Sequence, residues 1–128
     1  MSVAFAFAGC SERSEEPQTE KKIVFTDGLG REVKLEKRPE RVAALLGSFA
    51  EVWTLSGGTL CAAAEDAWSD FGLDLGDAVN IGGVHSPSVE KLLSADPDFV
   101  LAGAYSASNT DMKDTLEQAG IAVAYFDV

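Results

Sequence analysis

The feature of this sequence that most constrains its fold is a series of short apolar runs separated by stretches of helical character. The runs span residues 41–46, 60–64, 99–103 and 121–126. Continuous apolar runs of this length are typical of strands that are covered on both faces. Strands that alternate with helices are joined by right-handed crossovers into a parallel sheet. We therefore predict an α/β fold with a doubly wound, mainly parallel sheet and flanking helices, forming one Rossmann-like lobe.

The stretches between the runs carry apolar residues at helical spacing. After the first run, Phe49 and Trp53 lie one helical turn apart, and Ser48 is expected to cap the helix that carries them. Pro87 is placed to open a second helix, because proline is favoured in the first turn. A third helix is predicted over residues 110–119.

A β-hairpin is predicted before the sheet. Residues 23–25 and 32–35 are short extended runs on either side of a turn that contains Gly28 and Gly30. A dinucleotide-binding loop is excluded, because the third glycine is missing and no helical pattern follows.

Length and charge limit the classes of function. The chain has 128 residues, 46% of them hydrophobic, which is enough for one domain with a core of its own. Its net charge of -11 argues against a nucleic-acid partner, since a polyanion is repelled by an acidic surface. Cys61 lies in an apolar run and is predicted to be a small buried hydrophobe, and no metal site is expected.

The N-terminal segment has the pattern of an export signal. Residues 1–9 are uncharged and largely apolar, Cys10 follows, and residues 11–22 form a polar tether. Phe7 to Cys10 resembles the lipobox of bacterial lipoproteins, in which small residues precede a cysteine that carries the lipid. We predict a signal segment over 1–10, a tether over 11–22 and a folded lobe over 23–128; a simple hydrophobic terminus is the alternative.

The geometry of a doubly wound sheet nominates a site. Ligands lie beyond the carboxyl ends of the strands, which here are residues 47–49, 65–68 and 103–106. The candidate ligand-binding residues at these ends and in the loop near residue 85 are Ser48, Phe49, Trp68, His85, Tyr105 and Ser106. Packing at the core rim is the alternative for the tryptophan, and an ordinary loop position is the alternative for the tyrosine and the single histidine. None of these loops carries an arginine to grip a strongly anionic ligand.

Residues 25–127 resemble the class III periplasmic binding proteins, the family that binds siderophores, haem and corrinoids. The likeness rests on the order and spacing of five pieces, namely residues 26–33, 39–42, 47–51, 81–93 and 96–101. It implies a two-lobed clamp that closes on its ligand and docks on an ABC permease. The second lobe is absent from this sequence, so the chain is expected to be the N-terminal lobe alone, as a fragment.

The resemblance also implies partners and a location. The expected ligand is a ferric siderophore, haem or a corrinoid, with no cofactor, no catalysis and no nucleic acid. Glu90 occupies the position of a glutamate that meets arginines of the permease, although a solvated carboxylate near a helix start is the alternative. The protein is expected outside the cytoplasm, lipid-anchored through Cys10 or periplasmic.

Two other functions remain open from the residues. An enzyme on a Rossmann-like or flavodoxin-like sheet would need a phosphate loop or a nucleophile elbow, and the sequence has neither motif. A lipoprotein sensor module without a transport role would have the same residues, so the sequence does not distinguish it from a transport protein.

Overall fold

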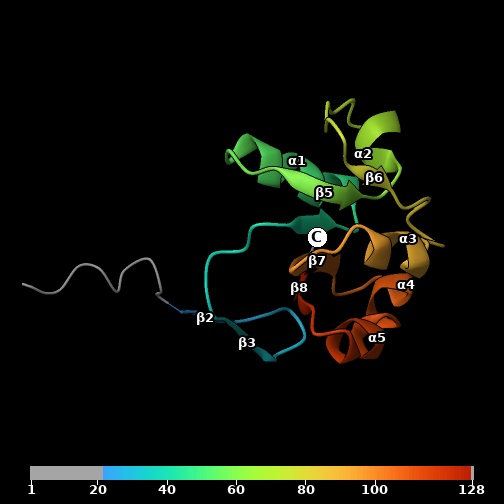
Figure 1. Ribbon diagram of the computed structural model, residues 1–128. Coiled ribbons are helices and arrows are strands. Elements are labelled where there is room, and N and C mark those ends of the chain that lie inside the picture. The colour runs from blue at the N-terminus through green and yellow to red at the C-terminus, as the bar shows by residue number, and fades with distance from the viewer. Residues whose placement is uncertain (1–21, 128) are drawn as a thin grey trace, which may run out of the picture.

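The computed structural model describes residues 22–127 and contains two sheets (Figure 1). The first is the predicted hairpin, in which β2 (Ile23–Thr26) pairs antiparallel with β3 (Glu32–Leu35). The second has five strands in the order β6-β5-β4-β7-β8, and every neighbouring pair is parallel. Its strands are β4 (Val42–Ala44), β5 (Leu60–Ala63), β6 (Val79–Asn80), β7 (Phe99–Gly103) and β8 (Ala122–Phe126).

Five short helices accompany the parallel sheet. They are α1 (Gly47–Leu55), α2 (Asp66–Ser69), α3 (Val89–Ser94), α4 (Ala107–Thr110) and α5 (Lys113–Gln118). The predicted fold class, a parallel α/β sheet with an N-terminal hairpin, is confirmed. The predicted helix over 110–119 is in fact two helices, and the segment 65–80, expected to be a loop, contains α2 and the edge strand β6. A four-residue helix and a two-residue strand are too short to show a period in sequence.

Helices cover both faces of the sheet, as a doubly wound fold requires. On one face, Leu92 of α3, Leu116 of α5 and Met112, which precedes α5, form one cluster with Val100 and Tyr125 of the strands. On the other face, small residues of α1 and α2 meet the strands closely, in a cluster formed by Ala44, Ala50, Ala63 and Ala67. The sheet therefore has helices α3 to α5 behind one face and α1 and α2 over part of the other.

The direction of winding changes between β4 and β7. The chain passes from β4 outward through β5 to β6, and then returns to the other side of β4 to place β7 and β8. The loops that leave β4 and β7 at their carboxyl ends therefore diverge, and a crevice between them is the usual result.

The hairpin is fastened to β8 through Asp27, which is buried. Its Oδ2 accepts a hydrogen bond from the Tyr125 N–H at 3.2 Å, and the Gly28 N–H donates to the Tyr125 carbonyl at 2.5 Å. A Cβ on Gly28 would lie 3.0 Å from that carbonyl oxygen and 2.9 Å from Asp127 Oδ1, so the close approach needs glycine. The turn of residues 27–31 between β2 and β3 thus has a structural role in joining the two sheets.

Two predictions on the N-terminus fall outside the described residues. Cys10 and residues 11–21 of the tether are not among the residues that the structure describes. The signal segment and the lipidation therefore remain predictions. Within residues 22–127, no helix combines the length and apolarity needed to cross a bilayer.

Candidate ligand-binding site

A pocket of about 400 Å³ lies where the winding direction changes. We call it the switch-point pocket; it is lined by Leu46, Val84, His85, Gly103, Tyr105, Ser106, Ala107 and Ser108. Leu46 follows β4 and Gly103 ends β7, the two strands that flank the change of direction. A Cβ on Gly103 would lie 2.9 Å from Leu46 Cδ1, so glycine lets these two strand ends close together. The position matches the one predicted for a doubly wound sheet.

The polar wall of the switch-point pocket is a small hydroxyl network. Ser108 Oγ donates to the Val84 carbonyl at 2.7 Å and lies 3.1 Å from Ser106 Oγ. Because a serine has one hydroxyl hydrogen and Ser108 gives it to Val84, the contact between the two serines has Ser106 as its donor. The lone pairs of Ser106 Oγ remain to accept a hydrogen bond from a ligand.

The network is held by a fully buried amide. Asn109 Oδ1 accepts a hydrogen bond from the Gly103 N–H at 2.8 Å, and Asn109 Nδ2 donates to Ser108 Oγ at 3.3 Å. The Asn109 carbonyl in turn accepts from the Tyr125 hydroxyl at 2.8 Å. The end of β7, the start of α4 and the middle of β8 are therefore joined by buried hydrogen bonds, which fixes one wall of the pocket.

Two larger side chains stand at the mouth of the switch-point pocket. Tyr105, two residues after the end of β7, is 79% exposed, and His85 is also exposed. A large aromatic side chain that is exposed beside a pocket buries apolar surface when it packs on a flat ligand, which favours binding. The imidazole adds a hydrogen-bonding group on the opposite loop.

The pocket has no cationic side chain and no cluster of metal ligands. None of its lining residues is lysine or arginine. Across residues 22–127, no group of three histidine, cysteine, aspartate or glutamate side chains is arranged to hold a metal ion. The pocket can therefore offer hydroxyls, an imidazole and an aromatic face, with apolar contact from Leu46 and Val84.

Of the six candidate ligand residues, His85, Tyr105 and Ser106 come together in the switch-point pocket, and the other three do not. Ser48 is half-buried in the first turn of α1. Phe49 packs edge-on against Phe126, with ring centroids 6.0 Å apart, and lines a different cavity. Trp68 lies half-buried on α2 against the alanine cluster. No measurement tests any of these roles, so they stay predictions.

Glu90 and Cys61 lie away from the switch-point pocket. Glu90 is exposed in the first turn of α3, a six-residue helix whose Lys91 N–H donates to Ser88 Oγ at 3.1 Å. The Cys61 side chain is half-buried in β5, and burial raises the pKa of its thiol, which fits the predicted packing role.

Sequence reasoning missed Ser108 and Val84. Ser108 lies within α4, and the contact that matters is with the Val84 carbonyl, 24 residues earlier. Its position two residues after Ser106 was the one available signal. Nothing in the sequence marks a backbone carbonyl as its partner.

Solved structures with similar folds are known, and the chain covers 34–38% of the three described next. The siderophore-binding protein BauB, solved with two acinetobactin molecules and ferric iron, has a TM-score of 0.69 at 17% identity over 84% of this chain and 38% of BauB. Staphylococcus aureus SirA, solved with staphyloferrin B, gives 0.69 at 19% identity over 83% of this chain and 37% of SirA. Haemophilus influenzae MolA, a molybdate-binding protein, gives 0.64 at 19% identity over 82% and 34%.

These neighbours are periplasmic binding proteins of the class that the sequence resembles, so the resemblance is confirmed at the level of the fold. At identities of 15–19% the likeness carries no ligand or residue role. The chain spans 34–38% of the neighbours' own length. Neither family models nor curated proteins give a match to this sequence.

Proposed function

We propose that this chain is the N-terminal lobe of a longer substrate-binding protein that delivers a small ligand to an ABC importer, and that the switch-point pocket is its half of the ligand site. The observation that carries the proposal is the position of this pocket between the carboxyl ends of β4 and β7. The fold shared with binding proteins of that kind supports it. The chain holds one lobe, so its sequence is a fragment of the proposed whole.

The side chains of the pocket favour a ligand class. An exposed tyrosine ring, an imidazole and a free serine acceptor suit a chelate with flat organic arms and hydrogen-bond donors. A bare oxyanion such as molybdate would need cationic or converging N–H groups, and the pocket lining contains no cationic side chain. We therefore place ferric siderophores first, with haem and corrinoids as further candidates, and expect no catalysis.

The test is calorimetric titration of the 128-residue chain with ferric staphyloferrin B, ferric acinetobactin, haem, cobinamide and molybdate. One wall of a cleft buries only part of a ligand, so weak but saturable binding of a chelate is expected. Tyr105→Ala should weaken it about tenfold, the loss of one aromatic contact of about 1.4 kcal/mol. Leu55→Ala is the matched control, because Leu55 is 80% exposed on α1 and lines neither the pocket nor its mouth.

Three results would count against the proposed ligand site. One is the absence of binding of any organic chelate at millimolar concentration. The second is binding that Tyr105→Ala and His85→Ala leave unchanged. The third is tight binding of molybdate alone, which would reverse the preferred ligand class.

We further propose that Glu90 docks on the permease. Its carboxylate is exposed and projects from a short helix that Ser88 caps, so it is free to meet a cation of a partner. Uptake of the ligand by cells that make the longer protein with Glu90→Ala should fall while ligand affinity stays unchanged. Asp111→Ala is the control, since Asp111 is exposed on a different helix end. Normal uptake by the Glu90 variant would exclude this role.

We also propose that Cys10 carries a lipid that holds the protein at the outer side of the cell membrane. In cells of the native type fed labelled palmitate, the chain should take up label, and Cys10→Ser should remove it. Cys61→Ser is the matched control, because Cys61 is half-buried in β5. Label that survives the Cys10 change would leave the apolar segment as an ordinary terminus.

A further inference from the structure

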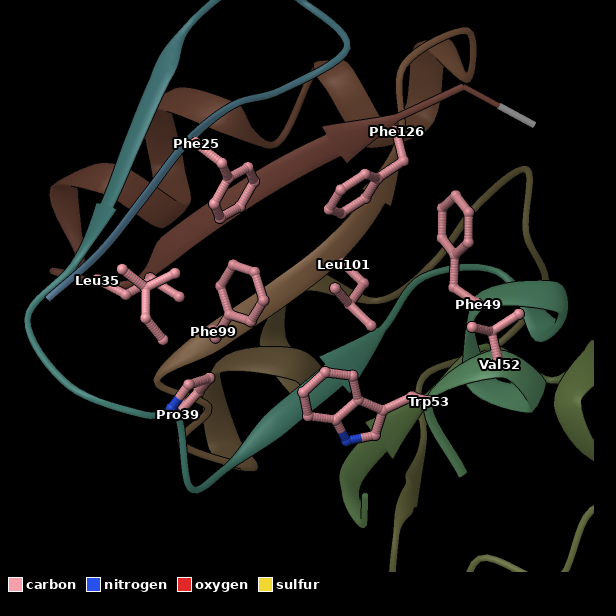
Figure 2. Close-up of a pocket in the computed structure, with 10 residues that line it drawn as sticks. Phe25, Leu35, Pro39, Phe49, Val52, Trp53, Phe99, Leu101 and Phe126 are labelled. Carbon is pink, nitrogen blue, oxygen red and sulfur yellow. The ribbon is translucent and has the colours of Figure 1, made fainter. Parts of the chain in front are cut away.

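Two cavities of this molecule differ sharply in polarity. Figure 2 shows the larger, of about 600 Å³, in which side chains of the hairpin and of α1 flank a floor from β7 and β8. Its lining side chains are apolar except for the indole of Trp53, whose Nε1 already donates to the Thr59 carbonyl at 3.0 Å. The switch-point pocket is instead lined by Ser106 and Ser108, and their hydrogen bonds determine what a ligand meets there.

The direction of the hydroxyl network is set by Asn109, which is fully buried. The Gly103 N–H can only donate, and it lies 2.8 Å from one terminal atom of the Asn109 side chain, which must therefore be the oxygen. The amide nitrogen is then turned toward Ser108 Oγ, 3.3 Å away. A flipped amide would set its N–H₂ group against the Gly103 N–H and leave both donors without an acceptor. The end of β7 thus fixes the orientation of this side chain.

The hydroxyl of Ser108 has no hydrogen-bonding capacity left. Its hydrogen goes to the Val84 carbonyl at 2.7 Å, because a carbonyl oxygen can only accept. Its two lone pairs accept from Asn109 Nδ2 and from the Ser106 hydroxyl, whose oxygen is 3.1 Å away. The hydroxyl hydrogen of Ser106 is therefore committed to Ser108 and is not available to a ligand.

Ser106 meets a ligand through its lone pairs. It is the N-cap residue of α4, where a serine oxygen usually accepts from an N–H of the first turn, but its side chain makes no such bond. The residue is partly exposed and lines the switch-point pocket. An oxygen that has lone pairs free and no hydrogen to give requires a donor from the ligand.

We infer that Ser108 is a positioning residue that holds Ser106 as a hydrogen-bond acceptor, so that the switch-point pocket selects flat ligand groups that carry an N–H or O–H donor. This rests on the proposed function, in which the pocket is half of a ligand site. Tyr105, 79% exposed at the pocket, offers an aromatic face to such a group. In a metal chelate, an amide N–H or a free hydroxyl beside an aromatic ring meets this requirement. A carboxylate arm does not, because its oxygens would face the lone pairs of Ser106.

The test uses two flat bicyclic probes of similar size that are both uncharged at neutral pH. Indole donates through its N–H, and isoquinoline accepts through its ring nitrogen. The 128-residue chain is titrated with each probe, and binding is followed through the backbone amide signals of Gly103 and Ser106 in NMR spectra. The wild type should bind indole about fivefold more tightly than isoquinoline, the effect of one neutral hydrogen bond. Ser106→Ala should remove this preference.

Ser108→Ala is the decisive variant. It removes the acceptor of the Ser106 hydroxyl hydrogen, which can then be donated to a ligand, so isoquinoline should bind about fivefold more tightly than it does to the wild type. A merely structural role of Ser108 would weaken both probes together. Ser108→Thr keeps the hydroxyl and should keep the wild-type preference. Thr110→Ala is the matched control, because it removes from α4 a hydroxyl that donates to the Ala107 carbonyl at 3.2 Å and does not line the pocket.

The outcomes separate this inference from the proposed function. Signals of Gly103 and Ser106 that move with both probes, together with a preference that Ser108→Ala leaves unchanged or an equal loss for both probes, overturn the role of Ser108 and leave the pocket standing as a ligand site. Ser106→Ala leaves the other bonds of Ser108 in place, so an indole preference that survives it overturns the inference even where Ser108→Ala does not fold. Signal changes confined to residues away from the pocket, or no binding of either probe at millimolar concentration, overturn both.

Discussion

Tyr125 shows how one residue serves both the core and the candidate site. It is fully buried in β8, its hydroxyl donates to the Asn109 carbonyl at 2.8 Å, and the Arg31 guanidinium lies 5.4 Å from its ring centroid. Through Asn109 it supports the end of β7, from which Tyr105 and Ser106 follow. Burial raises the pKa of the Tyr125 hydroxyl to about 12.

This pKa predicts an alkaline limit of stability. A pKa raised in the folded state means that the folded state holds the proton more tightly than the unfolded chain does. The contribution of the Tyr125 hydroxyl to stability is therefore complete below pH 10 and is lost as pH rises toward 12. The free energy of unfolding from urea titrations should therefore fall over this interval. Tyr125→Phe should flatten the fall and cost about 1 kcal/mol at pH 7 through the lost hydrogen bond. An equal alkaline fall in the variant would assign the effect to other groups.

At the scale of the element, α1 begins in a way that the sequence did not reveal. Ser48 was expected to cap it, and this was wrong: the helix begins at Gly47, with Leu46 as its extended N-cap residue and no side-chain bond from that position. The Gly47 N–H instead donates to Asp66 Oδ2 at 3.0 Å. A carboxylate from α2 thus occupies the positive end of α1, where negative charge is favourable.

Two substitutions distinguish the cap that was expected from the one that is present. Asp66→Ala should lower the free energy of unfolding by about 1 kcal/mol, because it removes the acceptor for Gly47 and the charge at the helix start. Asp66→Asn should cost less, since its amide oxygen still accepts the bond. Ser48→Ala should change the free energy of unfolding by less than about 0.5 kcal/mol. Chemical denaturation at pH 7 measures all three, and a larger loss from Ser48→Ala would contradict the structure.

Local patterns in the sequence predict the strands, whereas contacts between distant residues determine the site. The four strands β4, β5, β7 and β8 were predictable, because each is a continuous apolar run between turn residues. The location of the switch-point pocket was predictable from winding rules alone. Which side chains reach it was not, since Phe49 turns to pack on Phe126, 77 positions later, and Ser108 meets Val84 across two loops. Such pairings depend on tertiary packing.

At the scale of the whole molecule, the buried carboxylate of Asp27 is one of the groups that join the two sheets. Asp27 Oδ1 accepts from the N–H groups of Leu29 and Arg31, each at 3.0 Å, which closes the hairpin turn. Its Oδ2 accepts from the Arg31 side chain and, at 3.2 Å, from the Tyr125 N–H of the parallel sheet. Burial raises the pKa of the Asp27 carboxyl, but these hydrogen bonds outweigh burial and leave its pKa below the usual value of 3.8.

Asp27→Asn is therefore expected to loosen the hairpin from the sheet. The new amide would set an N–H₂ group where Oδ2 now faces three donors, so about 2 kcal/mol of stability should be lost at pH 7. Glu117→Gln, on the exposed side of Arg31, is the control and should cost less than about 0.5 kcal/mol.

Two measurements test whether Asp27 holds the hairpin on the parallel sheet: the acid dependence of stability and the amide exchange of the hairpin. A carboxyl whose pKa is lowered on folding stabilises the protein above its unfolded pKa, and this contribution disappears as pH falls through the folded pKa. The difference in unfolding free energy between wild type and Asp27→Asn should then be full at pH 7 and shrink below pH 3.8. At neutral pH, amides of β2 and β3 should exchange faster in the variant, while those of β4 and β7 change less, because the parallel sheet retains its own ladder. Uniformly faster exchange across both sheets would mean that the hairpin is an inseparable part of the core.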